Sequence, residues 1–262
     1  MKFFKKIDSN HQHKLAIEEL KRGRTNNALT VLNRSLENFE DHVPSLELRA
    51  DINARLNKWD KTLTDLKKIQ SLNSSFKDIN MFVGNSYFFT RNFDLAIEYL
   101  TLHIQDKTHS FEAYLHRAYS YLAIGKKTEA LSDIEKAISI VPRNFHLYIA
   151  KANILEELNK IDTALLTFDK AIGIEQEDTS TYFSIIHKVD FLQRNDKGKD
   201  AISILDKEIS ENPCNADLYF KRGEIHLTNG DAELSKTDLS IALNFGIFEA
   251  KTKIKNIAQH RR

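Results

Sequence analysis

Glycine and proline are scarce in this chain. Its 262 residues include eight glycines and three prolines, roughly a third of the share (~12%) that the two residues usually make up together. A fold of many short strands needs more of both residues at its turns, so the composition argues against one. Long helices joined by short links are favoured instead.

Cysteine and net charge are also nearly absent. The single cysteine, Cys214, cannot form a disulfide within the chain, so nothing indicates an oxidising compartment. The 38 basic and 37 acidic side chains leave a formal net charge of +1, which provides no global field that selects nucleic acid or membrane. Because 41% of the residues are hydrophobic and 29% are charged, the chain can bury a packed core and does not have the composition of a disordered protein.

Long hydrophobic runs are missing as well. No stretch approaches 18 consecutive apolar residues, and the apolar segment after the basic start of the chain is broken within two residues. Neither a membrane-spanning helix nor a secretory signal peptide is therefore expected. We expect a cytoplasmic protein.

Small residues recur with a fixed period. Five of them stand 34 residues apart, one step of 37 follows, and the spacing then returns to 34, as shown by Ala16, Ala50, Gly84, Ala118, Ala152, Val189 and Gly223. A fixed period of this length is the sequence signature of a repeat architecture. The longer step places three extra residues near Thr179, Ser180 and Thr181, where we expect a local change in the packing between units.

Further rows keep the same register over seven units. A second row of small residues comprises Ala28, Thr62, Ala96, Ala130, Ala164, Ala201 and Ser235. Four residues later each unit has a large apolar side chain, at Leu32, Leu66, Leu100, Ile134, Phe168, Leu205 and Leu239. A turn position is occupied by Gly23, Asn57, Arg91, Gly125, Asn159, Asp196 and Gly230. All but Arg91 are residues that tolerate left-handed or turn geometry.

The rows predict that each unit is a pair of helices of about a dozen residues with a short break between them. Small residues allow the two backbones to cross closely, and the large residue one turn later fills the space beside the crossing. Neither helix can bury its apolar face alone, so stacked units build a continuous core. A helical bundle with accidental matches is the alternative, which three rows in register over seven units disfavour.

The chain resembles the tetratricopeptide repeat family, whose 34-residue unit is a helix–turn–helix. The fourth unit matches the family pattern best, with Tyr114, Ala118, Tyr121, Gly125, Ala130, Ile134, Ala137 and Pro142 at the family's spacings. The units are expected at 9–42, 43–76, 77–110, 111–144, 145–178, 182–215 and 216–249. The chain departs from the pattern at Gln12, where the family favours an aromatic residue, and the family's proline is present only as Pro142 and Pro213.

The resemblance implies an all-α fold, a right-handed superhelical α-solenoid of about seven units. Residues 1–8 form a basic segment before the units. Residues 250–262, with Ile254 and Ile257 among lysines, are expected to form an amphipathic capping helix, because the last unit of a stack needs a polar outer face.

The resemblance also implies that the first helix of each pair lines a concave groove. The predicted function is a non-catalytic scaffold or adaptor that binds a partner protein or peptide there, since a contiguous strip of exposed apolar and aromatic side chains is typical of a binding surface. The alternative is that these side chains only pack between neighbouring helices. The predicted contact residues are Met81, Phe82, Asn85, Phe89, Leu115, His116, Tyr119, Ile149, Asn153 and Ile186.

Asn85 and Asn153 occupy equivalent places two units apart, with Tyr119 between them. An asparagine amide offers both a donor and an acceptor, so it can pair with the backbone of an extended peptide without reading the peptide's side chains. Many repeats of the family hold peptides in this way. The alternative is an exposed helix face that simply tolerates asparagine.

The charges on the first helices suggest the chemistry of the partner. Family members that clamp the C-terminal carboxylate of chaperones have lysines and arginines there. Here those places hold Met81, His116, His146 and Ala150 around Asn85, and Ile149, His187, Asp217 and Lys221 around Asn153. Acidic residues outnumber basic ones on these helices nine to five, as Glu47, Asp51, Asp78, Glu112, Glu156, Glu157, Asp190, Asp217 and Glu224 against Lys14, Lys21, Arg55, Arg194 and Lys221. We expect a partner with apolar anchors and some basic residues, and not the acidic C-terminal tail of a chaperone.

Both ends of the chain are basic. Residues 1–24 and residues 248–262 each carry a net charge of +4, which leaves open an alternative function as an accessory protein at nucleic acid or at a membrane surface. Solvated termini are the commoner explanation of such charge. Nucleic acid is not the expected partner, because no motif for it is present.

No enzyme, cofactor or metal site is predicted. The motifs of nucleophilic hydrolases, zinc proteases and dinucleotide-binding folds are absent. His11 and His13 lie close together without cysteine or carboxylate partners, which is a weak metal signal. No base or cation adjoins Cys214 in the sequence, so it has no sign of a reactive thiol.

Overall fold

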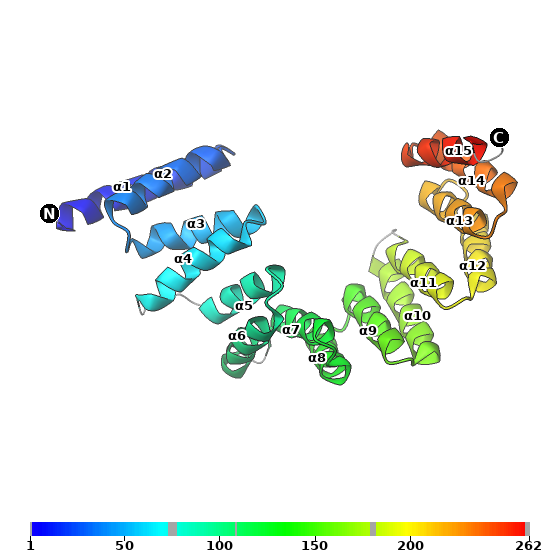
Figure 1. Ribbon diagram of the computed structural model, residues 1–262, viewed down its shortest axis with the longest axis horizontal. Coiled ribbons are helices and arrows are strands. Elements are labelled where there is room, and N and C mark those ends of the chain that lie inside the picture. Colours follow the sequence, from blue (N-terminus) through cyan, green and yellow to red (C-terminus); the bar gives the residue numbers. More distant parts are fainter. Residues whose placement is uncertain (1, 73–77, 108, 179–181, 260–262) are drawn as a thin grey trace. The chain divides into compact units, whose positions relative to one another are not determined.

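A computed structural model describes residues 2–72, 78–107, 109–178 and 182–259, and within these ranges all regular structure is helical. Figure 1 shows the helices in chain order. The first eight are α1 (Lys2–Lys21), α2 (Thr25–Asn38), α3 (Val43–Arg55), α4 (Trp59–Ser71), α5 (Ile79–Phe89), α6 (Phe93–Asp106), α7 (Phe111–Ala123) and α8 (Lys127–Ile140). The others are α9 (Phe145–Glu157), α10 (Ile161–Asp178), α11 (Phe183–Arg194), α12 (Gly198–Glu211), α13 (Ala216–Thr228), α14 (Ala232–Asn244) and α15 (Glu249–Gln259).

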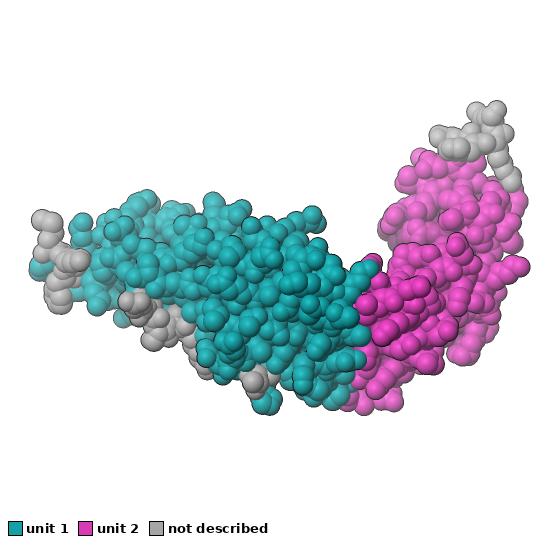
Figure 2. All heavy atoms as spheres, turned by 60° about the horizontal axis from the view of Figure 1, so that its bottom comes forward, with its two compact units in different colours: residues 1–142 teal, residues 143–262 magenta. Residues whose placement is uncertain are grey.

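The chain divides into two compact units, residues 1–142 and residues 143–262 (Figure 2). Unit 1 contains four antiparallel helix pairs, α1/α2 to α7/α8, and unit 2 contains three pairs and the final helix α15. Within each unit the first helices of consecutive pairs contact one another, for example α5 with α7 and α11 with α13. The fold is therefore the expected all-α solenoid of helix–turn–helix pairs.

The predicted rows of small and large residues form the contact inside each pair. Every member of the three rows is buried in the structure. The approach is closest where glycine stands, because a Cβ atom added to Gly84 would lie 2.7 Å from Leu100 Cγ and 3.1 Å from the Leu100 backbone nitrogen. Such crowding leaves almost no space beside the crossing, which is the packing expected from a small residue facing a large one.

The two hydroxyl members of the second row show the same proximity through hydrogen bonds. The Thr62 hydroxyl donates to the Ala50 carbonyl at 3.3 Å, and the Ser235 hydroxyl donates to the Gly223 carbonyl at 2.8 Å. Both hydroxyls are buried and satisfied across the crossing, so these polar atoms are accommodated without a desolvation penalty.

Replacing Gly84 by alanine tests the crossing. We expect Gly84→Ala to lower the free energy of unfolding by about 1 kcal/mol, because overpacking costs roughly 1–3 kcal/mol and the better helix propensity of alanine returns about 1 kcal/mol. The matched control is Gly173→Ala in α10, where an added Cβ meets nothing within 4 Å, and which should stabilise by about 0.5–1 kcal/mol. Urea unfolding of both variants measures the difference, and equal effects would contradict the crowding.

The turns inside the seven pairs share one backbone geometry. The residue at the predicted turn position has a positive φ in every pair, from 56° at Asn57 to 87° at Gly230. The following residue donates its backbone N–H to a carbonyl five residues earlier, as from Lys126 to Tyr121 at 2.8 Å. This is the Schellman motif that ends helices. Arg91, the exception in the sequence, adopts the same left-handed conformation with φ of 61°.

Arg91 should therefore be the most strained of the seven turn residues. We expect Arg91→Gly to raise the free energy of unfolding by about 0.5–1 kcal/mol, since glycine removes a left-handed cost of roughly 1–2 kcal/mol and adds some unfolded-state entropy. Gly125→Ala, at the equivalent turn with φ of 80°, should destabilise by about 1 kcal/mol. Thermal unfolding of the two variants checks these opposite signs, and a loss of stability in Arg91→Gly would refute the assignment of strain.

The N-terminal residues belong to the first helix pair, whereas the C-terminal residues form a separate helix after the last pair. The basic residues 2–8 do not precede the first helix but form its first turns, since no breaker interrupts the segment. Ser9 in α1 then bonds across to α2, with its hydroxyl donating to the Ser35 carbonyl at 2.8 Å. At the other end α15 is the expected capping helix, in which Ile257 is buried against α14 and Ile254 is half-buried.

Two further expectations concern the three extra residues and a membrane-spanning helix. The three extra residues Thr179, Ser180 and Thr181 lie outside the described residues, so the change in packing expected there stays a prediction. None of the helices in the described ranges has the length and hydrophobicity that a membrane crossing requires.

Candidate functional site

An aromatic cluster lies on the first helices α5 and α7 of unit 1. Phe88 stacks on the His116 ring at a centroid distance of 5.0 Å and lies 6.4 Å from the Tyr119 ring. Phe89 stacks on Trp59 at 4.1 Å. Phe89 keeps 44% of its surface exposed and Tyr119 keeps 37%, so the cluster presents aromatic surface to solvent on a packed base.

Asn85 is held at the edge of this aromatic cluster. His116 Nδ1 and Asn85 Oδ1 are 2.8 Å apart, and since a carbonyl oxygen only accepts, the Nδ1–H of His116 is the donor. Nothing else among the described residues bonds the Asn85 amide, so its NH₂ group is free to donate to a ligand. The Tyr119 hydroxyl is likewise without a hydrogen bond inside the described structure. The arrangement therefore offers polar groups beside exposed rings.

The other predicted residues of unit 1 flank this cluster. Phe82 is 41% exposed, while Leu115 and Met81 are half-buried, and the Met81 sulfur accepts from the Ser110 hydroxyl at 3.8 Å. The structure thus brings together Asn85, Phe89, His116 and Tyr119, with the remaining three on the same two helices.

In unit 2 the predicted contact residues Ile149, Asn153 and Ile186 differ in their burial and in their surroundings. Ile149 is only 5% exposed, so it packs inside the unit and contributes little surface. It lies in a turn of α9 that is buried on all sides, because Leu147, Tyr148 and Ala150 are buried as well. Asn153 on the same helix is half-buried, and no hydrogen bond within the described residues uses its amide. Ile186 lines a pocket of about 400 Å³ with Phe183, Phe220 and Lys221 between α11 and α13.

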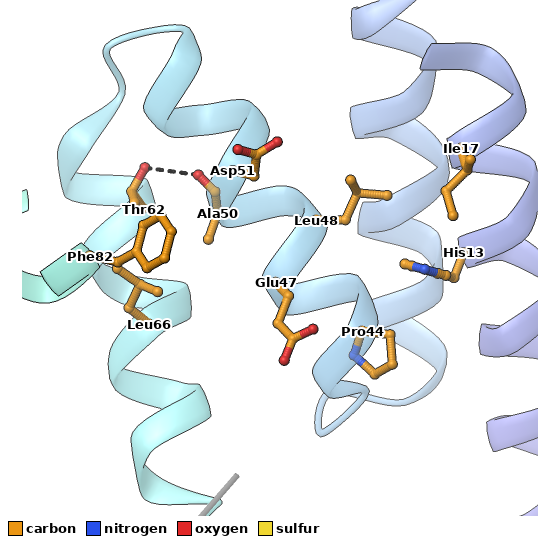
Figure 3. A pocket seen from close by; sticks show the side chains of 10 residues that line it. All are labelled: His13, Ile17, Pro44, Glu47, Leu48, Ala50, Asp51, Thr62, Leu66 and Phe82. Atoms are coloured by element: carbon orange, nitrogen blue, oxygen red, sulfur yellow. Dashed lines mark hydrogen bonds between the residues drawn. The ribbon is translucent and has the colours of Figure 1, made fainter. Parts of the chain in front are cut away.

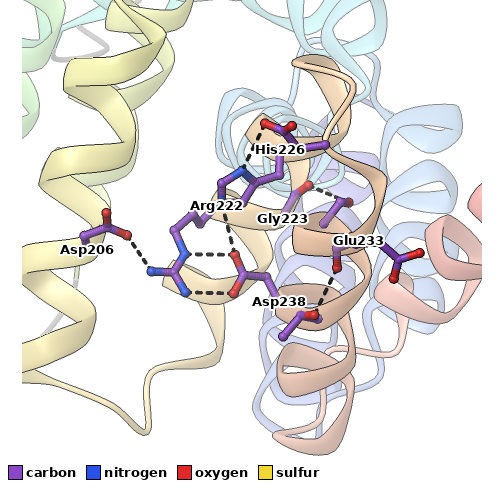
Figure 4. A network of polar contacts seen from close by, with 9 residues as sticks. Asp206, Arg222, Gly223, His226, Glu233 and Asp238 are labelled. Atoms are coloured by element: carbon purple, nitrogen blue, oxygen red, sulfur yellow. Dashed lines mark hydrogen bonds and ion pairs between the residues drawn. The ribbon is translucent and has the colours of Figure 1, made fainter.

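Three arginines of the first helices bind carboxylates of the second helices. Arg222 in α13 forms two parallel bonds at 2.8 Å to the Asp238 carboxylate in α14 and also bonds Asp206 in α12 (Figure 4). The Asp238 and Asp206 carboxylates raise the pKa of the Arg222 guanidinium. Arg49 and Arg117 repeat the arrangement in unit 1, with Asp65 and Asn33 and with Asp133 and Thr101.

We call these three groups the arginine clamps. Each joins a first helix to the second helix of its own pair and to that of the preceding pair. The signal in the sequence is an arginine with polar partners 16 residues before and after it, which is not part of the rows of small and apolar residues. Bidentate arginine–carboxylate pairs of this kind fix geometry as well as charge.

Many of the acidic residues counted on the first helices are neutralised inside the structure. Asp51 pairs with Arg55 at 3.0 Å, Glu156 with Arg194 at 2.8 Å, and Glu224 with Lys253 at 2.8 Å. Asp78 pairs with Lys107, and Asp190 with Lys221. The acidic excess is therefore smaller than the sequence suggests, and any attraction for a basic partner depends on the carboxylates that remain.

Two histidines of the first helices, His116 and His187, have lowered pKa values. Burial lowers the pKa of His116, and it also lowers the pKa of His187 in unit 2, where Asp190 opposes the effect. In a neutral His116 the Nε2 atom is an acceptor while Nδ1–H holds Asn85.

Acid should weaken unit 1 through His116. Folding lowers the pKa of His116, so the unfolded chain binds the proton more readily than the folded chain. The contribution of neutral His116 to the free energy of unfolding is therefore fully present above the ordinary pKa of 6.5 and is lost as the pH falls below that value. We expect the free energy of unfolding to decrease from pH 7.5 to pH 5.5, and to decrease less in His116→Phe, which keeps a ring on Phe88. Urea titrations at both pH values test this, and parallel curves for the two proteins would contradict it.

A pocket in unit 1 was not predicted from the sequence. It has a volume of about 400 Å³ and lies among the first helices α1, α3 and α5, above residues of α4. Phe82 is the predicted contact residue that lines it. Its other walls belong to the first two repeats, where the family pattern is weak and does not mark the residues of a groove.

Comparison with known proteins identifies the repeats. Residues 111–144 and 145–178 each match the family model of the tetratricopeptide repeat. The chain carries tetratricopeptide repeats. A solved tetratricopeptide repeat protein from Parabacteroides merdae aligns over 96% of this chain and 98% of its own, with a TM-score of 0.69 and 16% identity. The tetratricopeptide fold thus extends over nearly the whole chain, although the bounds of the other five repeats stay predictions.

Two curated proteins are similar in sequence. One is the DnaJ homolog subfamily C member 7 homolog of Dictyostelium discoideum, with 24% identity over 69% of this chain and 30% of that protein. The other is Hsp70-Hsp90 organizing protein 2 of Arabidopsis thaliana, with 26% identity over 47% of this chain and 21% of that protein. The chain spans less than a third of the length of either relative.

Proposed function

We propose that this chain is a non-catalytic scaffold that binds a segment of a partner protein along the first helices of its repeats. Proteins built from tetratricopeptide repeats mediate protein–protein interactions, and solenoids of this kind use extended surfaces for binding. The observation that carries the proposal is the exposed aromatic cluster of α5 and α7, with the free amide of Asn85 at its edge. Rigid rings bury area at low entropic cost, and a free amide sets the register of a peptide backbone.

The proposed partner segment has apolar anchors and some basic residues. Apolar anchors suit Phe82, Phe89 and Tyr119, which are each exposed by more than a third. One relative is named for organising chaperones, and by analogy the partner of this chain would be the tail of a chaperone. The places of a carboxylate clamp argue against an acidic tail, because Met81, His116 and Ala150 supply no permanent positive charge there.

Among the described residues, we find no contact that favours action through the basic ends. Lys253 in α15 is engaged with Glu224 and lies over the Phe220 ring, so part of that positive charge serves the packing of the final helix. The cytoplasmic location also stays a prediction.

The proposal is tested by affinity capture from the source cell followed by mass spectrometry and by titration of the recovered partner. The inner variant carries Asn85→Ala, Tyr119→Ala and Asn153→Ala. The matched outer variant carries Leu95→Ala, Leu102→Ala and Leu166→Ala, three exposed residues of second helices. We expect the inner variant to lose at least about tenfold in affinity, since several contacts worth about 1 kcal/mol each disappear.

The outer variant should bind like the unaltered chain. Equal retention of the partner by the inner variant and the unaltered chain would refute the proposal, and loss in the outer variant alone would move the binding site to the second helices. Far-ultraviolet circular dichroism of all three proteins verifies that they are folded.

A further inference from the structure

The pocket of unit 1 has mainly apolar walls and two half-buried carboxylates, Glu47 and Asp51, of which Asp51 is paired with Arg55. His13 and Ile17 of α1 stand on one side, and Phe82 of α5 and Leu66 of α4 on the other (Figure 3). Glu47 lies on α3 between these two sides. The pocket is large enough for one long side chain but not for a folded element.

Glu47 breaks a row that is apolar in the later repeats. The residues at the equivalent place on the first helices of the third to seventh repeats are Met81, Leu115, Ile149, Ile186 and Phe220. An apolar residue therefore satisfies the packing at this place, and the fold itself does not require a carboxylate there.

The Glu47 carboxylate is also unpaired. It has no hydrogen bond or ion pair with any described residue, whereas its neighbour Asp51, one turn on, pairs with Arg55. Glu47 is half-buried, and burial raises the pKa of its carboxyl group. An isolated charge in an apolar recess is unfavourable unless a counter-charge reaches it. The free chain therefore carries a cost at Glu47 that a bound cation would remove.

We propose that this pocket receives one lysine or arginine side chain of the bound partner segment, with its cation on the Glu47 carboxylate and its aliphatic stem against Ile17, Leu48 and Phe82. Charge complementarity selects this occupant, since an acidic side chain would be repelled and an apolar one would leave the carboxylate without a counter-charge. The long stem of lysine or arginine suits the apolar walls, because such residues bury their methylenes and keep the charge at the tip.

Phe82 connects the pocket to the aromatic cluster. It lines the pocket and stands on α5, the helix that also carries Asn85 and Phe89. A partner segment lying on α5 could thus place a basic side chain into the pocket. The nature of the occupant as part of a polypeptide rests on the proposed function, whereas the preference for a cation rests on the pocket alone.

The experiment is an NMR titration of the full chain with three small probes. These are the N-acetyl methylamides of lysine, of norleucine, which has the stem without the ammonium group, and of glutamate. We expect the lysine probe to give saturable shifts confined to the pocket residues and to lower the pKa of Glu47 in ¹³C spectra. The norleucine probe should bind about tenfold or more weakly, as expected for a lost charge-assisted bond, and the glutamate probe should not bind.

Variants at Glu47 separate binding from folding. Glu47→Gln should weaken the lysine probe about tenfold or more, while Glu112→Gln, an acidic residue of α7 outside the pocket, should leave it unchanged. Glu47→Met, which introduces the residue of the next repeat, should raise the melting temperature and abolish binding of the lysine probe. A lower melting temperature in Glu47→Met would show a structural role and overturn the proposal.

The remaining outcomes are also decisive. Equal binding of the norleucine and lysine probes, or full affinity in Glu47→Gln, would overturn the cation pocket. Neither result depends on capture of a partner by the Asn85, Tyr119 and Asn153 surface. If the inner variant keeps its partner while binding of the lysine probe still requires Glu47, the proposed function is refuted and the cation pocket is supported. If the inner variant loses its partner while binding of the lysine probe does not require Glu47, only the cation pocket is refuted.

Discussion

The close crossing of the two helices in each repeat is the constraint on which the structure depends. Gly84, where no Cβ fits against Leu100 without movement, shows how tightly the backbones approach. A crossing of this kind uses one face of each helix completely, and the Schellman turn fixes where the second helix begins. The first helices are thereby left with a face that the crossing does not consume. Aromatic rings, amides and carboxylates on that face are free to serve binding.

The rows that repeat in the sequence predicted the fold well because they report burial, and burial follows helical periodicity. They predicted the position of every turn and a suitable residue type at six of the seven; Arg91 was the exception, and the structure shows that it adopts the left-handed conformation as well. The arginine clamps were not foreseen, since they depend on side-chain direction between helices rather than on spacing along one helix. The same reason explains Ile149, whose position on the first helix of its repeat indicated surface but which lies in a turn of α9 that is buried on all sides.

The acidic residues of the first helices are of two kinds, those with a counter-charge inside the fold and those without one. Asp51 has its counter-charge within α3, and Glu156 and Glu224 have theirs on neighbouring helices, so these carboxylates offer little to a ligand. Glu47 has none, and the apolar residues at its equivalent positions show that stability alone would favour a different side chain. Residues that lower stability without a structural benefit are common at binding sites. The count of charges in the sequence could not make this distinction, because pairing is a property of the folded chain.

The arginine clamps hold two of the junctions between repeats in unit 1. Arg49 ties the first repeat to the second, and Arg117 ties the third to the fourth. The equivalent position on α5 is Val83, so the junction between the second and third repeats has no such tie. Aromatic contact joins these repeats instead, because Trp59 of α4 stacks on Phe89 of α5. The pocket spans this junction, with Glu47 on one side and Phe82 on the other, so its width is determined by the angle between two repeats that ring stacking holds, and not by an arginine clamp.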